Sequence, residues 1–151
     1  GMQLNKQTDY ALRVLLYLAF VGETRLVNID EIVSKFHILR NHLIKIISKL
    51  ARLKFIITYR GVNGGMKINP ETLSMKLDQI IAAFKPTFEI VQCEHLVCPL
   101  TGMCRLKSVL DEASNNFVAT LSKYTLAEML PANESTIQKI MLMFESGRSV
   151  K

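Results

Sequence analysis

The sequence has 151 residues, of which 49% are hydrophobic and 21% are charged, and its formal net charge is +6. This length fits one compact domain with an added dimerisation arm, and it excludes two full-sized domains. No apolar run approaches the roughly eighteen residues that cross a bilayer, and the N-terminus lacks the features of a signal peptide, so we expect a soluble cytoplasmic protein without membrane contact. The positive charge favours a polyanion such as nucleic acid as partner.

The first predicted helix runs from residue 4 to residue 20. The apolar residues predicted to face the core are Leu12, Leu15, Leu16 and Ala19. Asp9 and Arg13 place opposite charges one turn apart in its middle. The pattern therefore predicts a core helix with one polar spot.

Two shorter helices with a brief connection follow. Asn28 is a plausible N-cap for the first, whose apolar side holds Ile29, Ile32, Val33 and Phe36. The second has an apolar stripe at the spacing i, i+3, i+4, i+7, formed by Leu43, Ile46, Ile47 and Leu50. Two helices joined by so short a turn predict a helix-turn-helix.

A β-hairpin is predicted next, from the extended segments 55–60 and 66–69 with a glycine-rich turn at residues 61–65 between them. Pro70 then begins a helix that Pro86 ends, with an apolar face of Leu73, Leu77, Ile80, Ile81 and Phe84. The predicted fold class is therefore mainly α with a small β-hairpin, with a winged helix-turn-helix domain over residues 2–84.

The remaining chain divides into a loop, a long helix and a tail. Residues 85–104 lack periodicity and carry the cysteines. A helix over residues 104–124 has a stripe formed by Leu106, Val109, Leu110, Ala113, Phe117 and Leu121. This stripe lies beyond the domain that would cover it, so residues 104–130 are interpreted as a dimerisation helix. A capping box of Thr125 and Glu128 predicts one further short helix, and residues 131–151 form an amphipathic tail.

The helix after residue 39 presents a polar face suited to DNA. If its apolar stripe is buried, Asn41, Lys45, Ser48 and Arg52 point away from the core. Arginine suits guanine and asparagine suits adenine in the major groove. The candidate base contacts are Arg40, Asn41 and His42, and the candidate phosphate contacts are Lys45, Lys49 and Arg52. The competing interpretation is an ordinary solvated helix face.

The hairpin supplies a basic wing. Arg60 stands at the start of the glycine-rich turn, Asn63 lies within it and Lys67 lies just beyond it. A thin, positively charged turn can approach a minor groove, where the negative potential attracts arginine. Residues 63–65 would equally form an ordinary hairpin turn, and this interpretation is compatible with a wing.

All three cysteines fall within twelve residues, as Cys93, Cys98 and Cys104. An odd number of clustered cysteines in a cytoplasmic protein argues against a disulfide framework and for metal ligation or redox chemistry. Three thiolates can hold an iron–sulfur cluster and leave one position for another donor. Zinc completed by His95, or free thiols, are the alternatives.

Four motifs resemble a known family. They are the runs at residues 8–13 (TDYALR), 40–47 (RNHLIKII) and 60–65 (RGVNGG), followed by the three cysteines. The chain resembles the NsrR-like nitric-oxide-sensing repressors, within the winged-helix iron–sulfur regulators that include IscR, from Met2 to about Leu130. Leu39 departs from the pattern, because relatives usually carry a small polar residue there that can cap the helix.

This resemblance implies a homodimer built on the long helix, with each cluster held by the three cysteines of one subunit. In NsrR-like proteins the fourth ligand is a carboxylate of the other subunit. The resemblance assigns this role to Asp9 in the present chain. IscR-like members place a histidine three residues after the third cysteine, where this chain has Lys107. The alternative for Asp9 is an ion pair with Arg13 or a helix N-terminal charge. Three cysteines suit either a 2Fe–2S or a 4Fe–4S cluster.

The resulting hypothesis is a DNA-binding repressor that nitric oxide releases from double-stranded DNA. The alternative within this class is a winged-helix regulator that senses iron, cluster status or thiol oxidation. An iron–sulfur electron-transfer or carrier protein is the alternative from another class, but it has no need for the basic helix face and wing. No enzyme is expected, because His37, His42 and His95 show no pairing with a nucleophile.

Overall fold

The computed structural model describes residues 5–84, 105–131 and 139. These residues divide into two compact units, which are described separately. The helix–hairpin unit comprises the described residues up to 75 and from 125 onward. The long-helix unit comprises residues 76–84 and 105–124. The cysteine loop and nearly all of the predicted tail lie outside the described residues.

Three helices begin the helix–hairpin unit: α1 (Lys6–Val21), α2 (Ile29–Phe36) and α3 (Arg40–Arg52). Asn5 caps α1, because its side chain accepts a hydrogen bond from the backbone N–H of Thr8 at 2.8 Å. Asn28 caps α2 in the same way through the N–H of Glu31 at 2.9 Å, as predicted. His37, in the left-handed conformation at φ 54°, ends α2 and turns the chain into α3.

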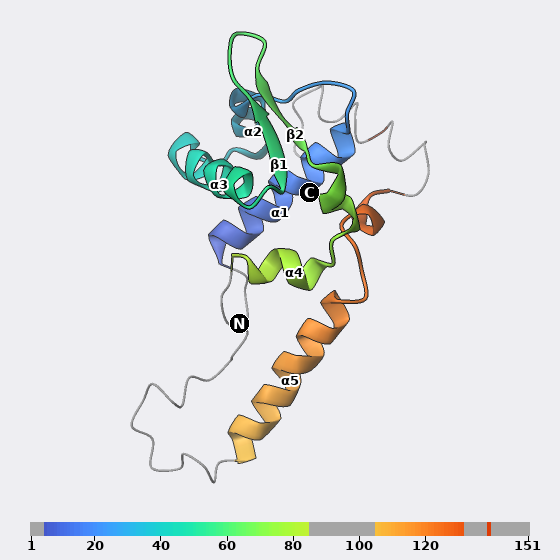
Figure 1. Ribbon diagram of the computed structural model, residues 1–151. Helices are drawn as coiled ribbons and strands as arrows, with labels where there is room; N and C mark the ends of the chain where they lie inside the picture. The colour runs from blue at the N-terminus through green and yellow to red at the C-terminus, as the bar shows by residue number, and fades with distance from the viewer. Residues whose placement is uncertain (1–4, 85–104, 132–138, 140–151) are drawn as a thin grey trace. The chain divides into compact units, whose positions relative to one another are not determined.

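The hairpin consists of β1 (Ile56–Tyr59) and β2 (Gly65–Ile68), paired antiparallel. Val27 exchanges backbone hydrogen bonds with Met66 at 2.9 and 2.8 Å, and so extends the pairing by one bridge. In the turn, the N–H of Gly64 donates to the carbonyl of Gly61 at 3.0 Å. Figure 1 shows this turn projecting beyond α2 and α3. The result is the predicted fold class, mainly helical with one small hairpin.

The core of this unit lies where α1, α3 and the hairpin meet. Its fully buried side chains include Leu15, Leu18, Ile32, Leu43, Ile46, Leu50, Ile68 and Leu126. The face predicted for α1 was partly wrong. Leu15 and Ala19 are buried as predicted, but Leu12 and Leu16 are half-buried. Ala11, Val14 and Leu18, which were not in the predicted set, are buried. Apolar residues fill almost every position of α1 after Arg13, so their spacing does not define one face.

The single helix predicted from Pro70 to Phe84 was also wrong. A 3₁₀ helix covers Pro70–Ser74, the backbone of Met75 and Lys76 is extended, and α4 covers Leu77–Ala82. Thr72 is buried and its hydroxyl donates to the carbonyl of Phe55 at 2.8 Å, which holds the 3₁₀ turn on the hairpin. The carbonyl of Met75 accepts from the N–H of Leu126 at 3.1 Å, and this tertiary bond replaces a helical one.

The long-helix unit contains α4 and α5 (Arg105–Leu121), which contact each other. The N–H of Leu77 donates to the carbonyl of Tyr124 at 3.0 Å, so the start of α4 is joined to the residues that follow α5. In the helix–hairpin unit, a 3₁₀ turn at Ala127–Met129 then carries the predicted capping box. Thr125 and Glu128 exchange side-chain and backbone hydrogen bonds at 2.9 and 3.3 Å.

Across residues 5–84 and 105–131, the helices are too short or too polar for any of them to traverse a bilayer.

Candidate nucleic-acid interface

Helix α3 separates its side chains into two faces, as the sequence predicted. Three of the four residues in the predicted apolar stripe, Leu43, Ile46 and Leu50, are buried, and the fourth, Ile47, is half-buried. The side chains on the opposite face are exposed, and they are Asn41, Lys45, Ser48 and Arg52. Lys49 is half-buried at the edge of this face. Because the buried stripe fixes the rotation of the helix, the polar face is held outward in one orientation.

The first turn of α3 carries the candidate base contacts. Arg40, Asn41 and His42 are all exposed. Leu39 occupies the N-cap position without a side-chain hydrogen bond, and it is 68% exposed. The apolar N-cap therefore leaves the first N–H groups of α3 without the capping that Asn28 gives to α2.

Arg40 pairs with a residue that the sequence did not indicate. Its Nη1 donates to Oδ1 of Asp30, in the first turn of α2. The two residues are ten positions apart and on different helices, so the i, i+3 and i, i+4 rules for helical charge pairs do not reach them. The packing of α2 against α3 brings them together.

The hairpin turn presents Arg60 and Asn63, which are both exposed. Val62 lies between them and is fully exposed. Lys67 is half-buried within β2, and its Nζ lies 5.7 Å from the ring centroid of Tyr59 on β1. The predicted cations of the wing are therefore divided, with Arg60 at the turn and Lys67 set back on the strand.

Two hollows flank α3 within the helix–hairpin unit. One, of about 230 Å³, lies between the start of α1 and α3, and its lining is Lys6, Gln7, Tyr10, His42, Lys45 and Ile46. The other, of about 500 Å³, is lined by residues of α2, α3 and β1: Ile29, Ile44, Ile47, Ser48, Ala51, Arg52 and Thr58. The first hollow adds Lys6 to the basic surface. Sequence reasoning missed this lysine because nothing in the helical pattern shows that α1 begins beside α3.

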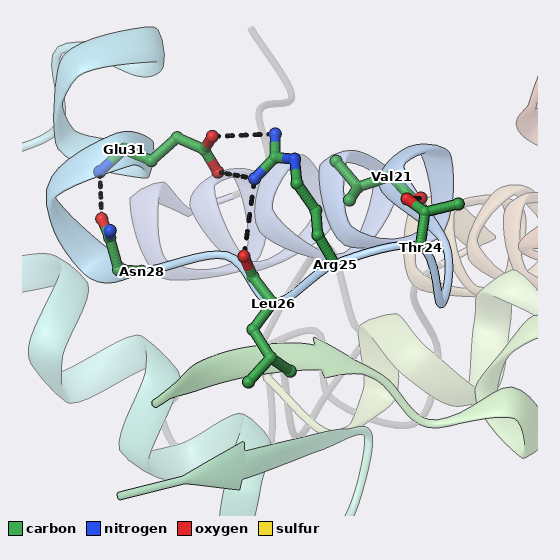
Figure 2. Close-up of polar contacts among 6 residues, drawn as sticks. All are labelled: Val21, Thr24, Arg25, Leu26, Asn28 and Glu31. Atoms are coloured by element: carbon green, nitrogen blue, oxygen red, sulfur yellow. Dashed lines mark hydrogen bonds and ion pairs between the residues drawn. The ribbon is translucent and has the colours of Figure 1, made fainter. Parts of the chain in front are cut away.

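The loop before α2 is tied to the helix by a polar cluster shown in Figure 2. The Arg25 guanidinium contacts the Glu31 carboxylate at 2.8 and 3.1 Å, and it also donates to the carbonyl of Leu26 at 3.5 Å. The hydrogen bond to Glu31 raises the pKa of Arg25. Burial raises the pKa of the nearby Tyr17 phenol above its usual value of 10.0. These contacts fix the start of α2, the helix that carries Asp30.

The predicted metal ligands are not brought together by the described residues. Cys93, Cys98 and Cys104 lie outside them. Asp9 lies on α1, where its Oδ1 accepts from Nε of Arg13 at 3.0 Å, which is the ion pair weighed as an alternative. The Asp9 side chain is about half exposed. Within the described ranges, no three His, Cys, Asp or Glu side chains gather closely enough to hold a metal ion.

Helix α5 exposes much of its predicted apolar stripe. Leu106 is 63% exposed and Val109 is 48% exposed. Ala113 is also exposed, whereas Leu110 and Phe117 are half-buried. The polar Ser114 is buried, as are Ile80 and Ile81 of α4. Within this unit, α5 therefore keeps a row of apolar side chains in contact with solvent.

Comparison with known families gives one match over most of the chain. The sequence profile of the Rrf2 family, described as iron-dependent transcriptional regulators, matches residues 4–132. This range includes all of the helices and strands described above.

Comparison with solved structures gives matches over nearly the whole chain. The structure of CymR, the global cysteine regulator of B. subtilis, is similar at a TM-score of 0.71 and 16% identity, over 87% of this chain and 100% of that chain. IscR of T. potens is similar at 0.70 and 20% identity, over 90% and 91%. The oxidized form of Staphylococcus aureus CymR is similar at 0.68 and 17% identity, over 87% and 100%. These likenesses establish the winged-helix fold.

Proposed function

The chain belongs to the Rrf2 family of winged-helix transcriptional regulators, and from this premise we propose that it is a homodimeric repressor of the NsrR-like kind. It binds double-stranded DNA and senses nitric oxide through an iron–sulfur cluster. The observation that carries the DNA-binding part is the outward polar face of α3, together with the exposed Arg60 of the hairpin turn.

In this proposal α3 enters the major groove. Arg40, Asn41 and His42 then meet base edges, because the first turn of a recognition helix reaches deepest. Lys45 and Arg52, one to three turns along the same face, approach phosphate oxygens, and Lys49 contributes from the edge. The basic composition supports this arrangement, since each phosphate that is neutralised releases condensed counterions.

The hairpin acts as the wing. Arg60 and Asn63 enter the adjacent minor groove, which attracts arginine through its negative potential. Lys67 supports the wing from the strand, where its stacking on Tyr59 holds the ammonium beside the hairpin rather than at the turn. The wing therefore adds affinity mainly through the single arginine at its turn, Arg60, and not through a cluster of cations.

Dimerisation uses the exposed row on α5. Leu106, Val109 and Ala113 occupy one face at helical spacing, and pairing them with the same face of a second copy removes apolar area from water. A symmetric pair of α5 helices brings two α3 helices to one DNA duplex, as two half-sites require.

The cluster would be held by Cys93, Cys98 and Cys104 of one subunit and by Asp9 of its partner. The donor set fits the group, because three thiolates suit iron–sulfur clusters and the Asp9 carboxylate is accessible on α1. Its existing partner is the exposed Arg13, a contact that costs little to exchange. When bound, the cluster supplies iron that reacts with nitric oxide.

Asp9 is the residue through which the signal reaches DNA in this proposal. As a ligand, Asp9 would tie α1 to the cysteine loop of the other subunit, and α1 packs directly on α3. Without that ligand bond, Asp9 would keep its ion pair with Arg13, and the spacing of the two recognition helices would not be fixed by the cysteine loop.

The decisive experiment is a DNA-binding titration on protein purified without oxygen, with the cluster assigned by visible absorbance and Mössbauer spectra. Duplexes selected from a random pool serve as probe. Tight binding that nitric oxide abolishes supports the proposal, and the slope of log K against log salt should be about −0.9 for each phosphate contact. Unchanged affinity after nitric oxide would contradict the sensing mechanism.

A matched pair of variants tests the DNA surface itself. Lys45→Glu should weaken binding by about tenfold or more and lower the salt slope by about one, because a phosphate contact is lost. Lys123→Glu makes the same charge change on an exposed lysine in the long-helix unit, and binding should change little. Equal loss in both variants would mean that net charge, not α3, governs the affinity.

The competing functions predict other outcomes. A regulator of iron, cluster supply or thiol oxidation would keep its DNA affinity under nitric oxide and lose or gain it with those effectors. An electron-transfer or carrier protein would retain its activity when Arg40 and Arg60 are both reversed in charge.

A further inference from the structure

Asp30 is the acidic residue in contact with the first residue of the recognition helix. The Asp30 carboxylate accepts a hydrogen bond from Nη1 of Arg40. Both side chains are in solvent, Asp30 at 75% and Arg40 at 53% exposed. Such exposed ion pairs contribute little to folding, about 0–1 kcal/mol. The contact therefore calls for a role other than holding the fold together.

The backbone that carries Asp30 is fixed independently of Arg40. Asn28 caps the turn through the N–H of Glu31, and the Glu31 carboxylate is held by Arg25 (Figure 2). Glu31 is thus already paired, and of these two adjacent carboxylates it is Asp30 that contacts Arg40. A carboxylate on a fixed turn restricts where the arginine side chain can extend.

We propose that Asp30 positions Arg40 so that its free guanidinium edge reads a guanine in the major groove. A guanidinium has five N–H donors in one plane, and Asp30 accepts from Nη1. The opposite edge, Nε and Nη2, then remains for the O6 and N7 acceptors of guanine, which arginine contacts in a bidentate manner. This inference rests on the proposed DNA-binding function and adds a residue of α2 to the determinants of sequence preference.

The two effects of Asp30 on DNA binding have opposite signs, which makes them separable. Its negative charge near phosphates weakens binding to any duplex. Its restraint on Arg40 strengthens binding to duplexes with guanine at the right position, because less side-chain freedom is lost on contact. A charge effect alone therefore changes all affinities together, whereas a positioning effect changes the ratio between them.

The test measures base preference with the full-length protein and a randomised duplex pool. The wild-type chain should select guanine at one position in each half-site. Arg40→Ala should lower the affinity ratio of selected to scrambled duplex by between about 5- and 150-fold. Asp30→Ala should lower the same ratio by roughly threefold to tenfold and broaden preference at that position only, without weakening binding to the scrambled duplex.

Three controls make the result specific. Glu23→Ala removes the same charge from an exposed position in the loop before α2, and it should leave the ratio unchanged. Asp30→Glu keeps a carboxylate and should restore part of the preference. In the double variant, Asp30→Ala should add no further loss to Arg40→Ala, because the two residues act as one unit. Thermal unfolding confirms that each variant remains folded.

Two outcomes would overturn the inference about Asp30 and leave the proposed function intact. In the first, Asp30→Ala strengthens binding to both duplexes equally, as Glu23→Ala does, and Asp30 is then only a surface charge. In the second, the preference for guanine sharpens, which means that Asp30 withholds Arg40 from DNA. A wild-type chain that selects no sequence from the pool would instead overturn the proposed function.

Discussion

Helices α3 and α5 both carry an apolar stripe, but they differ in how much of it their own unit buries. In α3 most of the apolar stripe is buried by its own unit, and Arg40, Lys45 and Arg52 are exposed. In α5 apolar side chains such as Leu106 and Val109 remain outside. An outward basic face needs an anionic partner, and an outward apolar face needs an apolar one. In the proposed function the two helices therefore meet two different partners, DNA for α3 and a second copy of the chain for α5.

The largest effect expected from this contrast is on the free energy of unfolding. Leu43→Ala in α3 should lower the free energy of unfolding by about 2–5 kcal/mol, because a fully buried side chain leaves a cavity. Leu106→Ala in α5 should cost less than about 0.5 kcal/mol at concentrations where the chain is monomeric. Urea unfolding of both variants measures the difference. A large cost for Leu106→Ala under those conditions would show that α5 is covered within its own chain.

Self-association provides the next test. Val109→Glu places a charge in the exposed row of α5, so it should weaken the dimer at least tenfold, because the carboxylate must lose its water in the interface. Sedimentation over a range of concentrations measures the dissociation constant. The matched change Val62→Glu alters an equally apolar but fully exposed residue at the hairpin turn, and the dimer should be unaffected. Dimers that persist in Val109→Glu would exclude this face as the interface.

A smaller effect on stability is expected from the N-caps of α2 and α3. Asn28→Ala should destabilise the fold by about 0.5–2 kcal/mol, since it removes the bond to the N–H of Glu31. Leu39→Ser should stabilise it by about 0.5–1 kcal/mol, because α3 gains a cap that it lacks. Thermal unfolding of the two variants should shift in opposite directions. A loss of stability in Leu39→Ser would show that the exposed leucine contributes packing.

The smallest predicted effect is a dependence on alkaline pH. Burial raises the pKa of Tyr17 in the fold, so the unfolded chain ionises first as the pH passes about 10. Stability present below pH 10 is therefore lost as the pH rises through the raised pKa. Urea unfolding at pH 8 and at pH 10.5 measures this loss, and Tyr17→Phe should reduce it. An identical loss in Tyr17→Phe would assign the pH dependence to other groups.

Local patterns predicted much of the helix–hairpin unit. The cap at Asn28, the stripe of α3 and the glycine-rich turn each depend on residues within a few positions of one another, where spacing determines geometry. The prediction of the buried face of α1 was partly wrong, because nearly every residue in the second half of this helix is apolar. The helix break after Ser74 was not predicted, because its cause is a hydrogen bond between Met75 and Leu126, which are distant in sequence.

The same limit applies to the candidate site. Exposed cations on α3 follow from helical periodicity, whereas the Asp30–Arg40 contact and the approach of Lys6 to α3 depend on how helices pack. No spacing rule relates residues on different helices. The cysteine ligands and their proposed partner Asp9 stay predictions, because the described residues include only the last of these four.

Two nearby residues of the hairpin turn, Gly64 and Val62, should differ in the substitutions that they tolerate. A Cβ at Gly64 would lie 2.2 Å from the backbone oxygen of Tyr59, so any side chain there forces the turn to open. Val62, two residues earlier, touches almost nothing. A saturation library across the turn should therefore retain only glycine at position 64 and nearly every residue type at 62. The conformation of the turn is thus held constant while its most exposed residue is free to vary, so the surface that the wing presents can change without a change in its backbone.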